Sequence, residues 1–355
     1  MRQLITVVLA VLATSWACSP APDGEPGTLP TWSFDQAMVF PADRSLLRPE
    51  DGVALADGTL VVADQAYGLR AIAPDGSGRP FGRFAEAGYV HEPPTRAGGP
   101  NGVSLEPDGL HVLVADVFTG AIYRVNVANE STEVVYQHPF GVNAARADST
   151  GALWFTQSTE NAGEDSEARL FAAVDAPMAD GGLFRIPPSA AGEPRPEASL
   201  AVGGLVFANG FAIDETAGRL YLAETVEDRV LGFNVSLETG ELSDRQVLAE
   251  VMTPDNLELD AVGRLWIVSP IRNEILVVDP ATGRADSVFR PDSADNDRMS
   301  AEWTRRGTAG EPRLDLMAPE LWAPLPGIIT GLILTPGDGP VYLAGLGDAL
   351  VRLGR

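Results

Sequence analysis

Six polar residues each begin one of six similar segments of this 355-residue sequence. They are Glu50, Asn101, Asn143, Asn209, Asp255 and Thr330. Every one offers a side-chain oxygen, and none is His or Cys. Hard oxygen ligands without nitrogen or sulfur favour Ca²⁺, with Mg²⁺ or Mn²⁺ next, over Zn²⁺ or Cu²⁺. If the fold gathers these residues, the chemistry to expect is that of a bound divalent cation.

The segments themselves indicate the fold that could gather them. Each has apolar residues at every second position, a tight turn and a second apolar run, as in "ANGFAIDETAGRLYLAE" from 208, so each is expected to form a β-hairpin. Further strands follow, and four strands in a repeat of roughly 40 to 50 residues are typical of propeller blades. The sequence therefore predicts an all-β, six-bladed β-propeller over 31–355. Residues 32–40 are expected to close the ring as the outer strand of the last blade. Six in-register repeats disfavour an open sandwich or two small β domains.

In a propeller the first strands of all blades line the central axis, so the six polar residues should meet at one channel mouth. Two acids in a narrow, largely apolar mouth are costly unless a cation neutralises them. A single Asn-Gly or Asp-Asn step is more simply a turn former, and only the repetition argues for a site. Two insertions, 158–182 and 290–328, should overhang the same mouth. Their aromatic residues Phe171, Trp303 and Trp322 could wall an apolar pocket.

At these positions the sequence resembles the calcium-dependent six-bladed propellers, which include the gluconolactonase and senescence marker protein (regucalcin) family, the paraoxonases and the squid-type diisopropylfluorophosphatase. The resemblance implies that the metal ligands are Glu50, Asn143, Asn209, Asp255 and Asn256. Asn101 and Asp116 stand where paraoxonases carry a catalytic histidine and its partner, so histidine-dyad chemistry is not expected. Ala144 stands where a second, structural calcium would need an acid.

A divalent ion at this mouth would suit a hydrolase that opens lactones or related esters, by polarising a carbonyl and activating water. Asp255 is the expected catalytic base or nucleophile. Substrate contacts or support of the ligands are expected from Asn101, Asp116, His138, Glu224 and Thr330. Two alternatives stay open: a strictosidine synthase-like enzyme, indicated by "WFTQST" from 154, and a propeller that binds a partner without catalysis and holds only a structural ion.

Composition limits the partners and the compartment. The net charge is −24, and every base is Arg because the chain has no Lys, which makes nucleic acid a poor partner and excludes Schiff-base chemistry. The apolar run "LITVVLAVLA" followed by Cys18 predicts a signal peptide over 1–18, lipidation of Cys18 and a Pro/Gly-rich tether over 19–30. We therefore expect an exported protein, either a periplasmic or outer-membrane lipoprotein or a secreted one, that touches the membrane only through its anchor. The sequence leaves the oligomeric state open.

Overall fold

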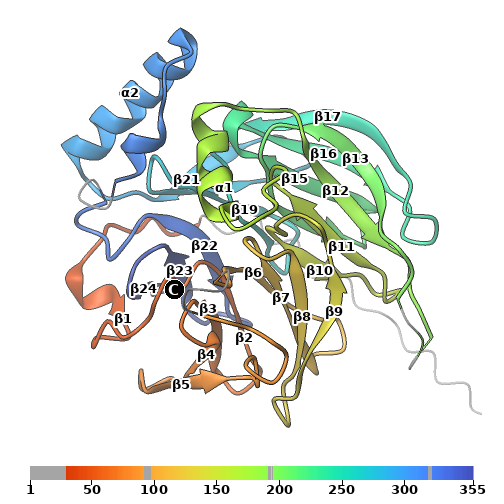
Figure 1. Ribbon diagram of the computed structural model, residues 1–355. Helices are drawn as coiled ribbons and strands as arrows, with labels where there is room; N and C mark the ends of the chain where they lie inside the picture. Colours follow the sequence, from red (N-terminus) through yellow and green to blue (C-terminus); the bar gives the residue numbers. More distant parts are fainter. Residues whose placement is uncertain (1–28, 92–96, 191–192, 194, 319–321, 355) are drawn as a thin grey trace, which may run out of the picture. The chain divides into compact units, whose positions relative to one another are not determined.

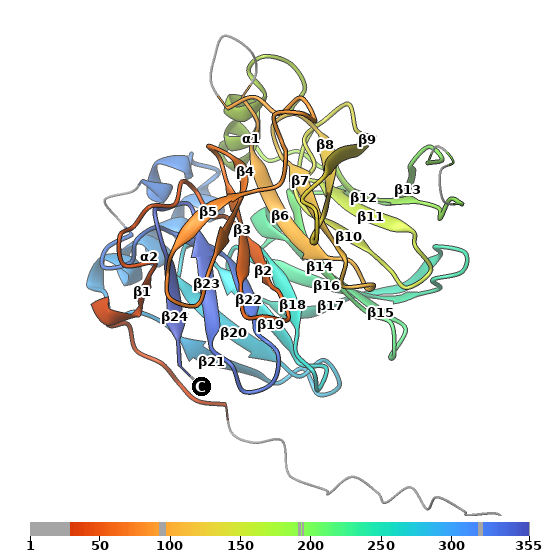
Figure 2. The ribbon, with the colours of Figure 1, turned by 90° about the horizontal axis from the view of Figure 1, so that it is seen from below.

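The computed structural model describes residues 29–91, 97–190, 193, 195–318 and 322–354. The predicted signal peptide, Cys18 with its predicted lipidation and most of the predicted tether lie outside these ranges. The described strands form six sheets of four antiparallel strands, and five of these sheets use four consecutive strands. Figures 1 and 2 show the sheets following one another around a centre. The prediction of an all-β, six-bladed propeller is confirmed.

The blades are numbered in chain order, and their strands run from the inner to the outer edge. Blade one contains β2 (Gly52–Ala54), β3 (Leu60–Asp64), β4 (Gly68–Ile72) and β5 (Gly78–Phe81). Blade two contains β6 (Pro100–Leu105), β7 (His111–Asp116), β8 (Ala121–Asn126) and β9 (Thr132–Gln137). Blade three contains β10 (Ala145–Ala147), β11 (Leu153–Gln157), β12 (Gly181–Ile186) and β13 (Ser199–Leu205).

The second half of the ring repeats this pattern. Blade four contains β14 (Ala208–Asp214), β15 (Arg219–Glu224), β16 (Arg229–Val235) and β17 (Leu242–Glu250). Blade five contains β18 (Leu257–Leu259), β19 (Leu265–Ser269), β20 (Glu274–Val278) and β21 (Ala285–Phe289). Blade six contains β22 (Ile329–Leu334), β23 (Val341–Gly345), β24 (Leu350–Leu353) and, as its outer strand, β1 (Val39–Phe40).

Residues 32–40 were expected to close the ring as an outer strand. They do so, although the strand is shorter than expected. Only Val39 and Phe40 pair with β24, and the 3₁₀ turn η1 (Gln36–Met38) precedes them. Trp32 forms a separate bridge to Phe289 of blade five, and its indole Nε1 donates to the carbonyl of Gly354. The segment thus ties blades five and six together and covers part of the outer edge of β24.

In two hairpins, an aspartate at the same position of the repeat holds the turn between the first and second strands. The carboxylate of Asp148 accepts the N–H groups of its turn, and its Oδ2 accepts the indole N–H of Trp154 at 2.8 Å. Asp260 does the same for Trp266, six residues later, at 3.1 Å. Both tryptophans are completely or almost completely buried. One aspartate at a fixed spacing therefore fixes the turn and satisfies a buried indole, which is the local reason that these segments fold alike.

The insertions carry the helices. Helix α1 (Ser166–Asp175) lies between β11 and β12, and α2 (Ala294–Ala309) with the 3₁₀ turn η3 (Leu314–Met317) lies between β21 and β22. A further 3₁₀ turn, η2 (Thr225–Glu227), follows β15. The α2 helix begins at the N-cap Ser293 and ends at Gly310, which adopts the left-handed conformation that suits glycine. Within the described residues, no helix has the length and apolar character needed to cross a membrane.

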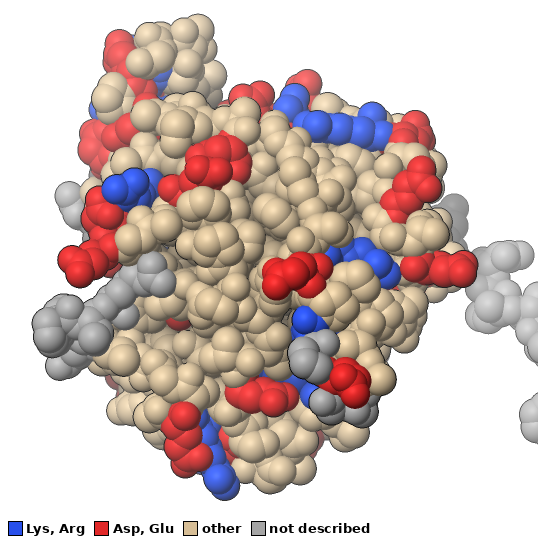
Figure 3. Space-filling view, turned by 45° about the vertical axis from the view of Figure 1, so that its right-hand side comes forward, with Lys and Arg blue, Asp and Glu red and all other residues tan. Residues whose placement is uncertain are grey.

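Charge is spread rather than concentrated. On the face shown in Figure 3 the acidic side chains form small scattered groups, and several lie next to arginines. Exposed ion pairs such as Arg44 with Asp348 and Arg284 with Asp286 account for part of this mixing. Pairs of this kind contribute little to stability.

Glycine follows three of the six polar residues at the channel mouth because neighbouring blades approach one another there. A Cβ on Gly102, Gly210 or Gly331 would lie within 3 Å of the backbone of the next blade. At Gly210 the nearest atom is the Cα of Asn256, at 2.6 Å, so the contact is with main chain that cannot rotate away. The repeated "Asn-Gly" step is thus explained by packing: it lets blade four press against the residues that begin blade five.

We predict that Gly210→Ala lowers the free energy of unfolding by about 1–3 kcal/mol, because the added methyl group forces blades four and five apart. Urea unfolding of the purified protein measures this. Gly354→Ala is the matched control, since nothing lies within 4 Å of where its Cβ would be. Equal stability of the two variants would contradict the packing explanation.

Candidate metal centre and active site

The structure brings all six predicted polar residues to one pocket. Glu50, Asn101, Asn143, Asn209, Asp255 and Thr330 line a cavity of roughly 70 Å³ at one end of the ring. All six are buried, with at most 8% of any of them exposed. They come from six different blades, so no local turn explains their convergence. The geometry supports the expectation that they act as a set.

Hydrogen bonds fix which atom of each amide faces the pocket. Asn143 donates from Nδ2 to Ser158 Oγ at 3.1 Å, and Asn209 donates from Nδ2 to Thr225 Oγ1 at the same distance. The Oδ1 atoms of both asparagines are buried and have no hydrogen-bond partner. The same is true of Oε2 of Glu50. Three orphaned acceptors at one place are rare in a folded protein, and a cation would satisfy all three.

The neighbouring residues hold this arrangement. Asn256 donates from Nδ2 to the other oxygen of Glu50, Oε1, at 3.2 Å. Thr330 donates its hydroxyl to the backbone carbonyl of Glu50 at 3.0 Å, and Asn101 donates its amide to the carbonyl of Asn143 at 3.2 Å. The structure therefore gives Asn256 the position of a residue that orients Glu50, and its role as a direct ligand stays a prediction.

The carboxylates at the mouth disfavour one another's ionisation. Burial, and then the charge of Asp255, raise the pKa of Glu50 well above its usual range. Burial, and then the charge of Asp51, raise the pKa of Asp255. Asp51 is likewise raised by burial and by Glu50. Without a cation these groups tend to keep their protons, and a divalent ion would reverse this tendency. The donor set, all oxygen with two carboxylates, fits a hard divalent ion.

Asp116 and Glu224 end the second strands of blades two and four, and both are completely buried. One oxygen of Asp116 accepts three backbone N–H groups, from Gly99, Phe118 and Thr119. Glu224 accepts the N–H of Val206 and pairs with Arg229 at 2.8 Å. Neither lines the pocket. These contacts show both acids fixing the loops that carry the site.

His138 lies in the crossover after blade two and does not line the pocket. It is 6% exposed, its ring packs edge-on against Phe155 and at a tilt against Phe184, and its Nε2 lies 2.8 Å from Gln157 Oε1. Burial lowers the pKa of His138, and the bond to Gln157 only partly opposes this. The surroundings fit a neutral core histidine. The expected role of His138 in contacting substrate or supporting the ligands stays a prediction.

The walls above the oxygens are apolar and come in part from the two insertions. Leu170, Phe171 and Val174 of α1, Trp303 of α2, Met317 of η3 and Ile271 line the cavity. Val174, Ile271 and Trp303 belong to one buried cluster, so α1 and α2 pack against the same end of the ring. Of the three aromatic residues expected to wall the pocket, Phe171 and Trp303 do so, and Trp322 is not among the lining residues.

Comparison with known proteins agrees with this architecture. The SMP-30/Gluconolactonase/LRE-like region matches residues 136–293 of the chain. Among solved structures, a gluconolactonase from Xanthomonas campestris is similar over 94% of this chain and 98% of its own, with 17% identity and a TM-score of 0.59. The chain is therefore similar to the gluconolactonases in fold and, over residues 136–293, in sequence. The resemblance stated from its strand-start residues is confirmed.

Two further structures share the fold of this gluconolactonase-like propeller. One, provisionally assigned as a gluconolactonase, has 16% identity and a TM-score of 0.57 over 92% of this chain and 100% of its own. A luciferin-regenerating enzyme has 14% identity and a TM-score of 0.55 over 89% and 95%. At such identities the likeness establishes the fold and not the reaction. No curated protein sequence is similar enough to be matched.

Sequence analysis missed a charged group inside the channel. Asp51 follows Glu50 and is buried, with Oδ2 accepting the N–H of Val103 at 3.0 Å. Arg146, from β10, forms an ion pair with Glu258 of β18 and donates to the carbonyl of Leu257 at 3.1 Å. The sequence offered one signal for these buried charges: Asp51, Arg146 and Glu258 stand in or beside inner strands whose other residues are mostly apolar. These charges make the channel of the gluconolactonase-like propeller polar beyond its mouth.

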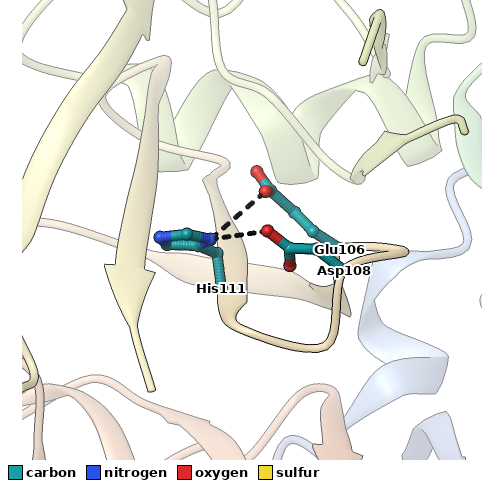
Figure 4. Close-up of side chains that lie close together, drawn as sticks. All are labelled: Glu106, Asp108 and His111. Atoms are coloured by element: carbon teal, nitrogen blue, oxygen red, sulfur yellow. Dashed lines mark hydrogen bonds and ion pairs between the residues drawn. The ribbon is translucent and has the colours of Figure 1, made fainter. Parts of the chain in front are cut away.

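A second cluster with metal-binding residue types lies at the turn between β6 and β7. Glu106, Asp108 and His111 have ligand atoms within 4.8 Å of one another, and Figure 4 shows both carboxylates directed at the imidazole. Arg124, however, makes two hydrogen bonds to Glu106, at 2.8 and 2.7 Å, and lies 3.1 Å from His111 Nδ1. A guanidinium already supplies the positive charge there, so the cluster is better explained as an ion-pair network than as a metal site.

Metal-free protein should lose stability as pH rises. The folded-state pKa values of Glu50, Asp51 and Asp255 are raised, so between about pH 4 and their folded-state values the folded protein retains protons that the unfolded chain has lost. Each retained proton lowers the free energy of unfolding by about 1.4 kcal/mol per pH unit. Stability is fully present below the unfolded pKa and is lost on the alkaline side.

Urea unfolding in the presence of a chelator at pH 5, 6, 7 and 8 measures this slope. Glu50→Gln should flatten it, whereas Glu238→Gln, at an exposed turn, should not. Calcium should restore stability most at pH 8, where the ligands are ionised. If the free energy of unfolding of the metal-free wild type is independent of pH, or increases with pH, the carboxyl groups of the cluster do not have raised pKa values.

Proposed function

We propose that this gluconolactonase-like propeller is a divalent-metal-dependent hydrolase, with Ca²⁺ the expected ion, that opens lactones or related esters. The observation that carries the proposal is the convergence of three orphaned oxygens, from Glu50, Asn143 and Asn209, beside Asp255 in a pocket roofed by apolar side chains. A gluconolactonase among proteins of the same fold supports the class of reaction. If the predicted export signal is used, the enzyme would act outside the cytoplasm.

Glu50, Asn143, Asn209 and Asp255 would hold the ion. A bound divalent cation polarises a carbonyl oxygen and lowers the pKa of water. Asp255 also presents a carboxylate to the cavity, where it can accept a proton from an attacking water. Asn256 keeps Glu50 in place through its amide, and the roof formed by α1 and α2 limits the access of bulk water. The acyl–oxygen bond of the lactone breaks, and the ring oxygen leaves as a hydroxyl.

The polarity of the pocket indicates the kind of lactone. Polar groups form its floor, and the walls from Leu170, Phe171 and Val174 offer no hydrogen bonds. A sugar lactone carries several hydroxyls that would lose water against these walls without gaining a partner. A lactone with an alkyl or aryl substituent would instead bury that substituent favourably. We therefore assign an apolar lactone as the substrate class.

Asp255→Ala should lower kcat/KM for a lactone at least about 100-fold, because it removes both a ligand and the proton acceptor. The assay is lactone hydrolysis by calcium-loaded protein, with a chelator abolishing the rate. Asp43→Ala, at an exposed position, is the control. Stoichiometric calcium binding without turnover of any lactone or aryl ester would favour a binding protein with a structural ion and would refute the proposal.

An alkyl-substituted δ-lactone should react with a kcat/KM at least about tenfold above that of gluconolactone. Phe171→Ala should narrow this ratio, since it removes one of the walls that the alkyl group would contact. The comparison needs only initial rates on the two substrates. Preference for gluconolactone in the wild type would overturn the assignment of an apolar substrate.

A further inference from the structure

Arg48 is the only cationic side chain among the described residues that line the pocket. It lies two residues before Glu50, in the segment that leads into β2. Its backbone N–H donates to Gly347 at 2.9 Å, and its carbonyl accepts from Glu50 at 2.8 Å. The segment is thus tied both to blade six and to the ligand cluster, so the position of the arginine is determined by the same contacts that build the site.

Two aromatic rings hold the guanidinium. Its central carbon lies 4.9 Å from the ring centroid of Phe118 and 5.8 Å from that of Phe171. Rings attract the face of a guanidinium and leave its N–H edges unused. Within the described parts of the chain, no carboxylate lies at ion-pair distance from Arg48, and its guanidinium makes none of the side-chain hydrogen bonds found there. The edges therefore remain available to a ligand.

The charges nearby leave this cation without a dedicated partner. Glu50 and Asp255 together would balance a divalent ion. Asp116 contributes a negative charge near Arg48, but its Oδ1 accepts three backbone N–H groups and its unpartnered Oδ2 makes no ion pair with the arginine. Glu167, the remaining acid close to the arginine, is exposed on α1. One unpaired cation in an apolar-walled cavity matches one monoanionic group, and a planar carboxylate matches the guanidinium fork in shape.

We propose that Arg48 is a specificity-determining residue that binds a carboxylate on the substrate. The inference rests on the proposed function: the substrate is an apolar lactone that also carries a carboxylate. The aromatic rings orient the guanidinium, the guanidinium fixes the carboxylate, and the lactone carbonyl is thereby placed over the oxygen cluster. A dianionic phosphate would need a second cation, and the described lining provides none.

The test uses two lactones that differ only in charge: a δ-lactone whose alkyl substituent ends in a carboxylate, and its primary amide. Calcium-loaded wild-type protein should prefer the carboxylate by about 10- to 100-fold in kcat/KM, as expected for a hydrogen bond to a charged group. Arg48→Met should abolish the preference, and Arg48→Lys should restore part of it. The control Arg44→Met removes an exposed arginine of the same segment and should keep the preference.

Binding is measured separately, so that the proposal survives or fails independently of turnover. The non-hydrolysable lactams of the same pair are titrated calorimetrically into wild type and Arg48→Met, with calcium content checked for both. Tighter binding of the carboxylate lactam that disappears in Arg48→Met supports the proposal. Equal binding of the two lactams by the wild type overturns the proposal. It is also overturned if Arg48→Met still binds the carboxylate lactam more tightly than the amide lactam, whether or not that variant has lost calcium. If neither lactone is hydrolysed, the proposed function fails, and the lactam titration still decides the role of Arg48.

Discussion

The structure depends on the burial of negative charge and unpaired oxygen at the mouth of a ring. Glu50 and Asp255 line one cavity together with Asn143 and Asn209, and the amide oxygens of both asparagines are buried without a hydrogen-bond partner. Desolvation of such a group is expensive, and no cationic side chain of the described chain pairs with the cluster. A fold that retains this arrangement gains by binding a cation, and the residues around the cluster are arranged to keep it in place.

The rest of the ring serves that arrangement. Glycines after three of the strand-start residues let adjacent blades approach, side-chain hydroxyls turn the asparagine nitrogens away, and buried acids such as Asp116 fix the loops outside the ring of oxygens. The insertions then add apolar walls and bring Phe171 over Arg48. The strand starts thus supply the oxygen cluster, and segments that have no counterpart in other blades supply part of the apolar walls. This division explains how a common fold can serve different substrates.

The sequence predicted what periodicity determines. Alternating apolar residues and turn steps gave the six blades, and position within the repeat gave Glu50, Asn143, Asn209 and Asp255. It could not show that Asn256 turns its amide to Glu50, that His138 is enclosed by aromatic rings, or that Arg48 enters the pocket, because these depend on contacts between blades and insertions. The closing strand was expected over 32–40, but only Val39 and Phe40 pair with β24. Local pattern predicts a strand, and tertiary packing decides its length.

The central claim is that the oxygen cluster binds a hard divalent cation. A crystal structure of the protein grown with calcium, with the ion identified by its anomalous scattering, tests it most directly. The account predicts one strong peak at the channel mouth, with Glu50 Oε2, Asn143 Oδ1, Asn209 Oδ1 and Asp255 at about 2.3–2.6 Å. Absence of a peak at that position, or amides turned so that their nitrogens face the centre, would contradict it.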